Sequence, residues 1–253
     1  MKVTLLQRDI VWADPQRNAE LISKELERLR GSDLYVLPEM FSTGFITGSV
    51  ENAETEPCAS LEKMKEWAAK YDCAIAGSIA LHTAEGNRNR FYFVKPDGSV
   101  TFYDKRHLFT YGGEHHRFTG GDERVIVEWR GMRFLLLVCY DLRFPVWARN
   151  RRDYDAIICV ANWPAVRSYA WDTLVRARAI ENQCFMLAVN RAGEDSVGPY
   201  KGGSVILEPH GEVVAACEDF RESSVTAEIR MKDLEAFRKA FPVMDDADGF
   251  KLG

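Results

Sequence analysis

The sequence has no surplus of basic residues and no long hydrophobic run. Its 33 Lys and Arg stand against 38 Asp and Glu, and the formal net charge of -5 offers a nucleic-acid backbone no basic surface. No stretch approaches the ~18 consecutive apolar residues of a membrane span, and the first residues lack the charged and apolar regions of a signal peptide. We therefore expect a cytoplasmic protein that binds neither nucleic acid nor membrane.

Metal-binding and disulfide patterns are also missing. None of the six cysteines has CxxC spacing, so neither a disulfide framework nor a zinc site is indicated, and we expect free thiols. The neighbouring His115 and His116 have no companion cluster, which makes them a weak metal-binding signal.

Linkers are absent as well. No Pro-, Gly- or Ser-rich stretch, block of like charge or low-complexity segment divides the chain. A content of 46% hydrophobic and 28% charged residues is that of an ordinary globular protein. We predict one domain over residues 1–253.

What is present is an alternation of strands and helices in the first half. Asp14 and Pro15 are typical of a helix start, and Gly31 of a helix end. Apolar periodicity and turn residues predict the following elements: strands over 2–8, 33–39 and 73–81, helices over 15–30 and 60–71, and hairpins over 91–105 and 125–139, the second turning at Arg130 and Gly131.

The second half repeats this order. A strand over 154–162, a helix over 168–183 capped by Ser168, a strand over 184–191 and a hairpin over 204–216 are predicted. The turn sequence PDGSV of the first half is matched by PHGEV in the second. This period is far above the ~20–50 residues of solenoid repeats, so we predict an α/β protein with two mixed sheets in an α-β-β-α sandwich.

Polar residues follow several predicted strands. Glu39, Lys105, Cys139 and the Asn162-Trp163 pair each stand where a strand ends. Open α/β sheets usually form their sites at the carboxyl ends of strands, because the loops there diverge. We therefore expect these side chains to share one site.

Each of these residues has a structural and a chemical interpretation. Cys139 is either a core thiol or a nucleophile, and the segment 143–152 resembles a helix start that would lower the pKa of the thiol. Glu39 is either a carboxylate of a solvated loop or the group that accepts the thiol proton. Lys105 is either part of a surface turn or an ammonium that faces an oxyanion together with the Tyr140 N–H.

Three segments carry a resemblance to a known family. They are VLPE ending at Glu39, YDKRHLF around Lys105 and CYDLRFP beginning at Cys139. Together they resemble the segments that carry the Glu-Lys-Cys triad of the nitrilase (carbon–nitrogen hydrolase) superfamily. Glu114 stands in YGGEHHRF, where many members carry a second glutamate. The resemblance covers nearly the whole chain, including ANWPAVRSYAW, RARAIENQ, NRAG and FPVMDDADGF, and is strongest to bacterial ω-amidases.

The resemblance implies a nitrilase-type α-β-β-α fold that forms a homodimer or higher homo-oligomer, without metal or organic cofactor. It implies a cysteine-dependent amidase that hydrolyses the terminal amide of 2-oxoglutaramate or 2-oxosuccinamate to the dicarboxylate and ammonia through a thioester. In this interpretation Glu39, Lys105 and Cys139 are catalytic, while Glu114 and the Tyr140 N–H support them.

The substrate-binding residues are less sharply defined by the sequence. Trp163 and Phe45 are candidates for the pocket wall, although both residue types also pack in ordinary cores. A 2-oxo acid needs a cation for its carboxylate, and Arg143 and Arg167 are the candidates. Arg176, inside RARAIENQ, fits helix packing or an interface ion pair better.

Alternatives remain open at this point. The triad determines which type of bond is hydrolysed and does not determine the acyl group of the substrate. An N-carbamoyl-amine hydrolase or another small aliphatic amidase is therefore the nearest alternative. A catalytically silent binding subunit is a second, which the intact triad disfavours. A redox-sensor role for Cys139 is a third, and it needs a resolving thiol such as Cys159 or Cys184.

Overall fold

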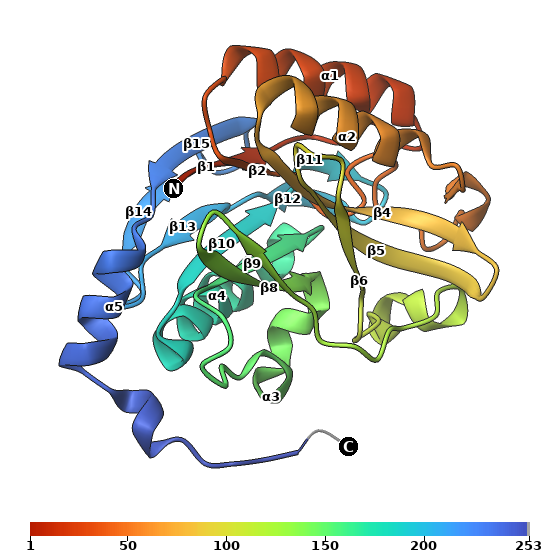
Figure 1. Ribbon diagram of the computed structural model, residues 1–253. Helices are drawn as coiled ribbons and strands as arrows, with labels where there is room; N and C mark the ends of the chain where they lie inside the picture. Colours follow the sequence, from red (N-terminus) through yellow and green to blue (C-terminus); the bar gives the residue numbers. More distant parts are fainter. Residues whose placement is uncertain (252–253) are drawn as a thin grey trace.

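The computed structural model describes residues 1–251, in which two large β-sheets face each other (Figure 1). The first sheet has the strand order β15 (Ser223–Glu228), β1 (Lys2–Gln7), β2 (Leu34–Val36), β4 (Ala74–Thr83), β5 (Gly86–Val94) and β6 (Val100–Asp104), with β3 (Glu54–Thr55) also paired to β4. β1, β2 and β4 are parallel, whereas β15, β5 and β6 are antiparallel to their neighbours. The sheet is therefore mixed, as predicted.

The second sheet repeats this plan. Its strand order is β14 (Val213–Ala216), β13 (Val205–Leu207), β10 (Phe185–Asn190), β9 (Ala156–Ala161), β8 (Met132–Val138) and β7 (Ile126–Trp129). β8, β9 and β10 are parallel, and antiparallel strands flank them. A separate hairpin joins β11 (Ala192–Asp195) to β12 (Gly198–Lys201). The predicted internal repeat is confirmed, since each half places three parallel strands beside an antiparallel hairpin.

Helices form the two outer layers. They are α1 (Pro15–Arg28), α2 (Ala59–Tyr71), α3 (Pro145–Ala148), α4 (Ser168–Asn182) and α5 (Met231–Ala240). Short 3-10 turns are η1 (Val50–Asn52), η2 (Thr110–Gly112), η3 (Glu114–His116), η4 (Cys139–Arg143), η5 (Ala165–Arg167) and η6 (Val243–Asp246). Figure 1 shows α1 and α2 on one side of the molecule and α3 and α4 on the other. The predicted α-β-β-α sandwich is thereby confirmed.

Neighbouring residues of β2 pack into two different hydrophobic clusters. Val36 of β2 lies in the cluster between the sheets, together with Phe134 of β8. Tyr35 lies in the cluster under the first pair of helices, with Ile22 of α1 and Met64 of α2. Because both faces of these strands are buried, their sequences are nearly continuous hydrophobic runs. In the described part of the chain no helix has the length and apolarity needed to cross a membrane.

Several element boundaries depart from the predictions. Asp14 does cap α1, accepting from the Arg17 N–H at 2.9 Å. Ser168 is the first residue of α4 instead of its cap, and the capping position falls on Arg167, whose side chain makes no capping hydrogen bond. The strand predicted over 33–39 covers only Leu34–Val36, so Glu39 stands three residues beyond it.

Candidate active site

The ends of four strands meet between the sheets. Lys105 directly follows β6, Cys139 follows β8 and Asn162 follows β9, while Glu39 lies in the loop after β2. β6 runs in the same direction as β2, because two antiparallel pairings separate it from β4. The carboxyl ends of β2 and β6 therefore lie at one edge, and the hydrogen bond from the Asn162 N–H to Glu39 brings the end of β9 to it, so the predicted convergence is found.

Lys105 is held between two carboxylates. Its Nζ donates to Glu39 Oε1 at 3.0 Å and to Glu114 Oε1 and Oε2 at 3.1 and 2.9 Å. Burial opposes the charge of Lys105, but the carboxylates of Glu114 and Glu39 outweigh it and hold the lysine pKa well above its ordinary value. Burial also raises the pKa of Glu114, and the charge of Glu39 adds to that rise although Lys105 opposes it. The ammonium therefore stays charged.

Two asparagines fix the carboxylate of Glu39. Asn89 Nδ2 donates to Oε1 at 2.8 Å, and the main-chain N–H of Asn162 donates to Oε2 at 2.7 Å. Asn162 Nδ2 also donates to the main-chain oxygen of Glu39 at 2.7 Å. Asn89 was not among the predicted site residues, because nothing in the sequence around it indicates a polar role. Asn162 was recognised only by its place at a strand end.

Glu114 is anchored by the backbone of its own loop. The Phe109 N–H donates to Glu114 Oε2 at 2.6 Å, and the Glu114 side chain is fully buried. Asn89 Nδ2 lies 3.3 Å from Glu114 Oε1 and so touches both carboxylates. Glu39 and Glu114 thus both contact Lys105 and share Asn89 as a donor.

Cys139 begins the turn η4 in a strained backbone conformation. Its φ is +48°, a left-handed value that is uncommon for a residue other than glycine and often marks a functional position. Burial raises the pKa of the thiol well above its ordinary value, the charge of Glu39 raises it further, and Lys105 opposes both. Cys139 is therefore a protonated thiol near neutral pH.

The prediction that a helix start lowers the pKa of Cys139 is wrong. Only a 3-10 turn follows the cysteine, and α3 begins at Pro145 and has four residues. Burial of the thiol outweighs the weak dipole of such short elements. The low pKa on which a redox-sensor role would rest is absent too.

Asp141 joins the segment of Cys139 to that of Lys105. Its buried carboxylate accepts from Tyr103 Oη at 2.8 Å and from the His107 N–H at 2.9 Å. Tyr103 and His107 flank Lys105 in sequence, and Asp141 stands two residues after Cys139. These hydrogen bonds therefore set the position of the ammonium relative to the thiol.

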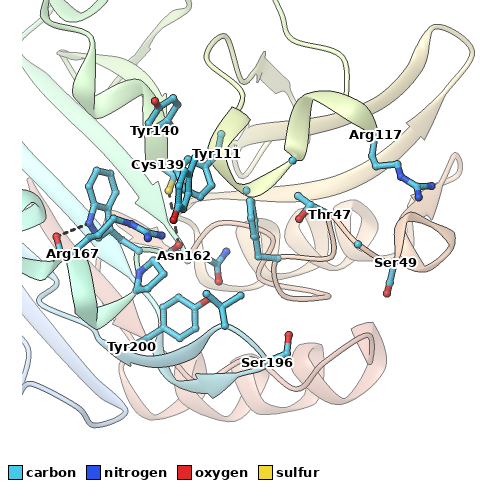
Figure 2. A pocket seen from close by; sticks show the side chains of 18 of the residues that line it. Thr47, Ser49, Tyr111, Arg117, Cys139, Tyr140, Asn162, Arg167, Ser196 and Tyr200 are labelled. Carbon is cyan, nitrogen blue, oxygen red and sulfur yellow. Dashed lines mark hydrogen bonds between the residues drawn. The ribbon is translucent and has the colours of Figure 1, made fainter.

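A cavity of about 500 Å³ opens onto this site (Figure 2). Cys139 and Asn162 line it, whereas Glu39 and Lys105 lie behind its wall. Both residues predicted for the pocket wall, Trp163 and Phe45, line the cavity, as does Tyr140. The thiol is consequently the catalytic candidate that an entering molecule meets first.

Arg143 and Arg167, the two arginines proposed from the sequence, line the cavity, as does Arg117. The guanidinium carbon of Arg143 lies 4.8 Å from the ring centre of Trp163, and that of Arg167 lies 5.1 Å from the ring centre of Phe109. Within residues 1–251, neither guanidinium forms a salt bridge. Both charges are thus open to an anionic ligand. The third arginine considered from sequence, Arg176, instead donates to the main-chain oxygen of Gly211.

Metal-ligating residues do not gather elsewhere in residues 1–251. No three His, Cys, Asp or Glu side chains there could hold a metal ion together. His115 and His116, the adjacent pair noted in the sequence, have ring centres 3.8 Å apart and no third ligand.

Comparisons with known proteins agree with this geometry. A model of the family described as carbon-nitrogen hydrolase matches residues 2–239. The chain is 48% identical to an omega-amidase, YafV, of Yersinia enterocolitica, over 100% of this chain and 98% of that protein. It is 33% identical to a 2-oxoglutaramate amidase of Bacillus subtilis (strain 168), over 96% of both.

A solved structure is similar over the full length. The crystal structure of XC1258 from Xanthomonas campestris, a CN-hydrolase superfamily protein with an arsenic adduct in the active site, superposes with a TM-score of 0.97. The two sequences are 42% identical, and the match covers 100% of this chain and 99% of that one.

Proposed function

Because the chain belongs to the carbon–nitrogen hydrolase family, we propose that it hydrolyses the terminal amide of small 2-oxo acid ω-amides. 2-Oxoglutaramate and 2-oxosuccinamate are the substrates, and the dicarboxylate and ammonia are the products. One observation carries the proposal: Cys139 opens into a cavity lined by Arg143 and Arg167, neither of which forms a salt bridge within residues 1–251, while the buried Glu39 and Lys105 lie behind it. The similarity to an omega-amidase and a 2-oxoglutaramate amidase supports the choice of substrate.

The first half of the reaction forms a thioester. Since the Cys139 thiol is protonated at neutral pH, attack on the amide carbonyl requires a base, and Glu39 takes the proton as the sulfur–carbon bond forms. Lys105 and the Tyr140 N–H stabilise the negative oxygen of the tetrahedral intermediate. The intermediate collapses when the carbon–nitrogen bond breaks and Glu39 returns the proton to the leaving nitrogen, which departs as ammonia.

The second half releases the acid. Water attacks the thioester carbonyl, Glu39 takes a proton from the water, and the sulfur leaves and regains a proton. The net change is the addition of one water to the amide, which yields a carboxylic acid and ammonia. Glu114 starts neither step, because both of its oxygens hold Lys105 in place.

The residues that line the cavity determine which amide the site prefers. A 2-oxo ω-amide presents an amide at one end and a carboxylate at the other, so a site for it needs a nucleophile and a cation separated by the length of the substrate. Arg143 and Arg167 supply the cation, and Trp163 and Phe45 enclose the carbon chain. Charge-assisted hydrogen bonds to the carboxylate are stronger than those to a neutral group, which favours the anionic amide.

We also propose that the chain folds as one domain over residues 1–253 and forms a homodimer or higher homo-oligomer in the cytoplasm. All six cysteines are free, as is usual in a reducing compartment. Val166 of η5 and Tyr169 in the first turn of α4 are each 84% exposed, and a partner subunit covering them would bury this apolar surface. Light scattering of the purified protein measures the assembly.

Ammonia release from a substrate panel tests the function. 2-Oxoglutaramate and 2-oxosuccinamate are compared with a neutral aliphatic amide and with an N-carbamoyl amine. The proposal expects the highest kcat/KM for the two 2-oxo ω-amides. A higher value for the neutral amide or the N-carbamoyl amine would overturn the substrate assignment and leave the bond type intact.

A further inference from the structure

The side-chain oxygen of Asn162 is a hydrogen-bond acceptor without a donor. We infer that this oxygen, Oδ1, accepts a hydrogen bond from the nitrogen of the scissile amide and holds that nitrogen as it leaves. The inference rests on the proposed amide hydrolysis and adds to it a residue that touches the leaving group.

The orientation of the Asn162 amide is fixed by its neighbours. Nδ2 donates to the main-chain oxygen of Glu39 at 2.7 Å, and rotating the amide by half a turn would set two oxygens against each other there. Oδ1 is buried, and no hydrogen-bond donor reaches it in the described structure. Asn162 lines the cavity, so a molecule bound there lies against this residue.

Asn162 also contacts both groups that react with the amide. Its main-chain oxygen lies 4.0 Å from Cys139 Sγ, a contact drawn in Figure 2, and its main-chain N–H donates to Glu39 Oε2 at 2.7 Å. An amide carbon bonded to the sulfur must turn its nitrogen toward Glu39 to receive the proton. The nitrogen then lies beside the residue whose side-chain oxygen lacks a donor.

The chemistry of the leaving group explains what such an acceptor contributes. The amide nitrogen carries two hydrogens and gains a third from Glu39 while the carbon–nitrogen bond breaks. An acceptor that binds one N–H directs the lone pair of the nitrogen toward the acid and stabilises the positive charge that develops during protonation. An ester oxygen has no hydrogen to donate and gains nothing from Oδ1.

Asn89 provides the matched control. It also donates to Glu39, through Nδ2 at 2.8 Å, and its Oδ1 is likewise buried without a partner. It is not part of the cavity lining, so an entering amide does not meet it. Loss of the Asn89 side chain therefore disturbs Glu39 without touching the leaving group.

The test compares Asn162→Ala and Asn89→Ala on 2-oxoglutaramate and on the methyl ester of the same acyl group. The alanine at position 162 keeps the main-chain N–H that binds Glu39. We expect Asn162→Ala to lower kcat for the amide about tenfold more than kcat for the ester, since the lost interaction is one hydrogen bond. Asn89→Ala should change the amide-to-ester ratio by less than about threefold.

The outcomes separate this inference from the function on which it rests. If the two variants shift the amide-to-ester ratio equally, Asn162 acts only through Glu39 and the inference is overturned while the amidase function stands. A wild-type protein that releases no ammonia from any amide overturns the function and the inference together. Asn162→Ser is measured beside Asn162→Ala, so that a folding defect in one variant does not decide the result.

Discussion

The ammonium of Lys105 lies 3.0 Å from Oε1 of Glu39, and neither side chain is exposed. The two residues are 66 positions apart in the sequence and reach each other only through the pairing of the first sheet. A buried charge that loses its partner is far more costly than an exposed one. The activity and the stability of the protein are therefore linked at this pair.

Replacing Glu39 by glutamine removes the proposed base and keeps the shape of the side chain. We expect Glu39→Gln to lower kcat by about 10²–10⁴ with a small change in KM, because general acid–base catalysis typically contributes that much. Ammonia release gives both constants. Glu62→Gln, at an exposed ion pair with Lys65, is the control, and a kcat for Glu39→Gln equal to that of this control would contradict the role of Glu39.

Replacing Lys105 by methionine leaves two buried carboxylates without their cation. We expect Lys105→Met to lose activity and to lower the free energy of unfolding by about 3–5 kcal/mol, the usual result of breaking a buried ion pair. Urea denaturation measures the change. Adding Glu114→Gln should restore part of the stability and none of the activity. A double variant as active as wild type would show that Lys105 is only structural.

Arg143 and Arg167 line the cavity and form no salt bridge within residues 1–251, whereas Arg176 lies outside the cavity lining. We expect Arg143→Met or Arg167→Met to raise KM for 2-oxoglutaramate about 10- to 100-fold, as a lost charge-assisted hydrogen bond costs about 1.5–3 kcal/mol. KM for a neutral amide should stay constant. Arg176→Met serves as the control, since that guanidinium binds Gly211 instead. Equal effects on the anionic and neutral amides would remove both arginines from substrate binding.

Buried thiols predict a loss of stability at alkaline pH. Burial raises the pKa of Cys58 and Cys73 to about 12 and that of Cys217 to about 11, from an ordinary value of 9.0. The folded chain then binds these protons more tightly than the unfolded chain. Stability is unaffected below the unfolded pKa and falls above it, by at most about 1.4 kcal/mol per thiol and pH unit, until the folded pKa is reached.

Denaturation by urea under reducing conditions, at about pH 7, about pH 9 and about pH 10, follows this loss. We expect the unfolding free energy to change little between the first two values and to drop steeply between the last two. Cys73→Ala should reduce the slope by the contribution of one thiol. A free energy that does not fall above about pH 9 would mean that the thiols are solvated in the folded protein.

The sequence predicted the sandwich because its hydrophobic periodicity and turn residues are local signals. The hairpin turning at Arg130 and Gly131 is one example, since both residues have the positive φ values that such a turn requires, +46° and +77°. The predicted positions of Glu39, Lys105 and Cys139 at one edge also follow from local strand ends. The number of domains stays a prediction.

The features of the site that the sequence could not predict depend on contacts between distant strands. The pKa of Cys139 is set by burial and by Glu39, which stands 100 residues earlier in the numbering, and not by the turn that follows the cysteine. Asn89 and Asn162 acquire their roles only when β5 and β9 are placed beside the loop of Glu39. Polar residues of this kind look like ordinary strand residues until the sheets are assembled.

Mass spectrometry of the intact protein, quenched during turnover of 2-oxoglutaramate, tests the central role of Cys139 most directly. The account predicts a transient mass increase equal to the acyl group, located on the peptide that contains Cys139. It further predicts that Cys139→Ala folds, shows no such increase and releases no ammonia. Ammonia release by Cys139→Ala at a rate near that of the wild type would contradict the account.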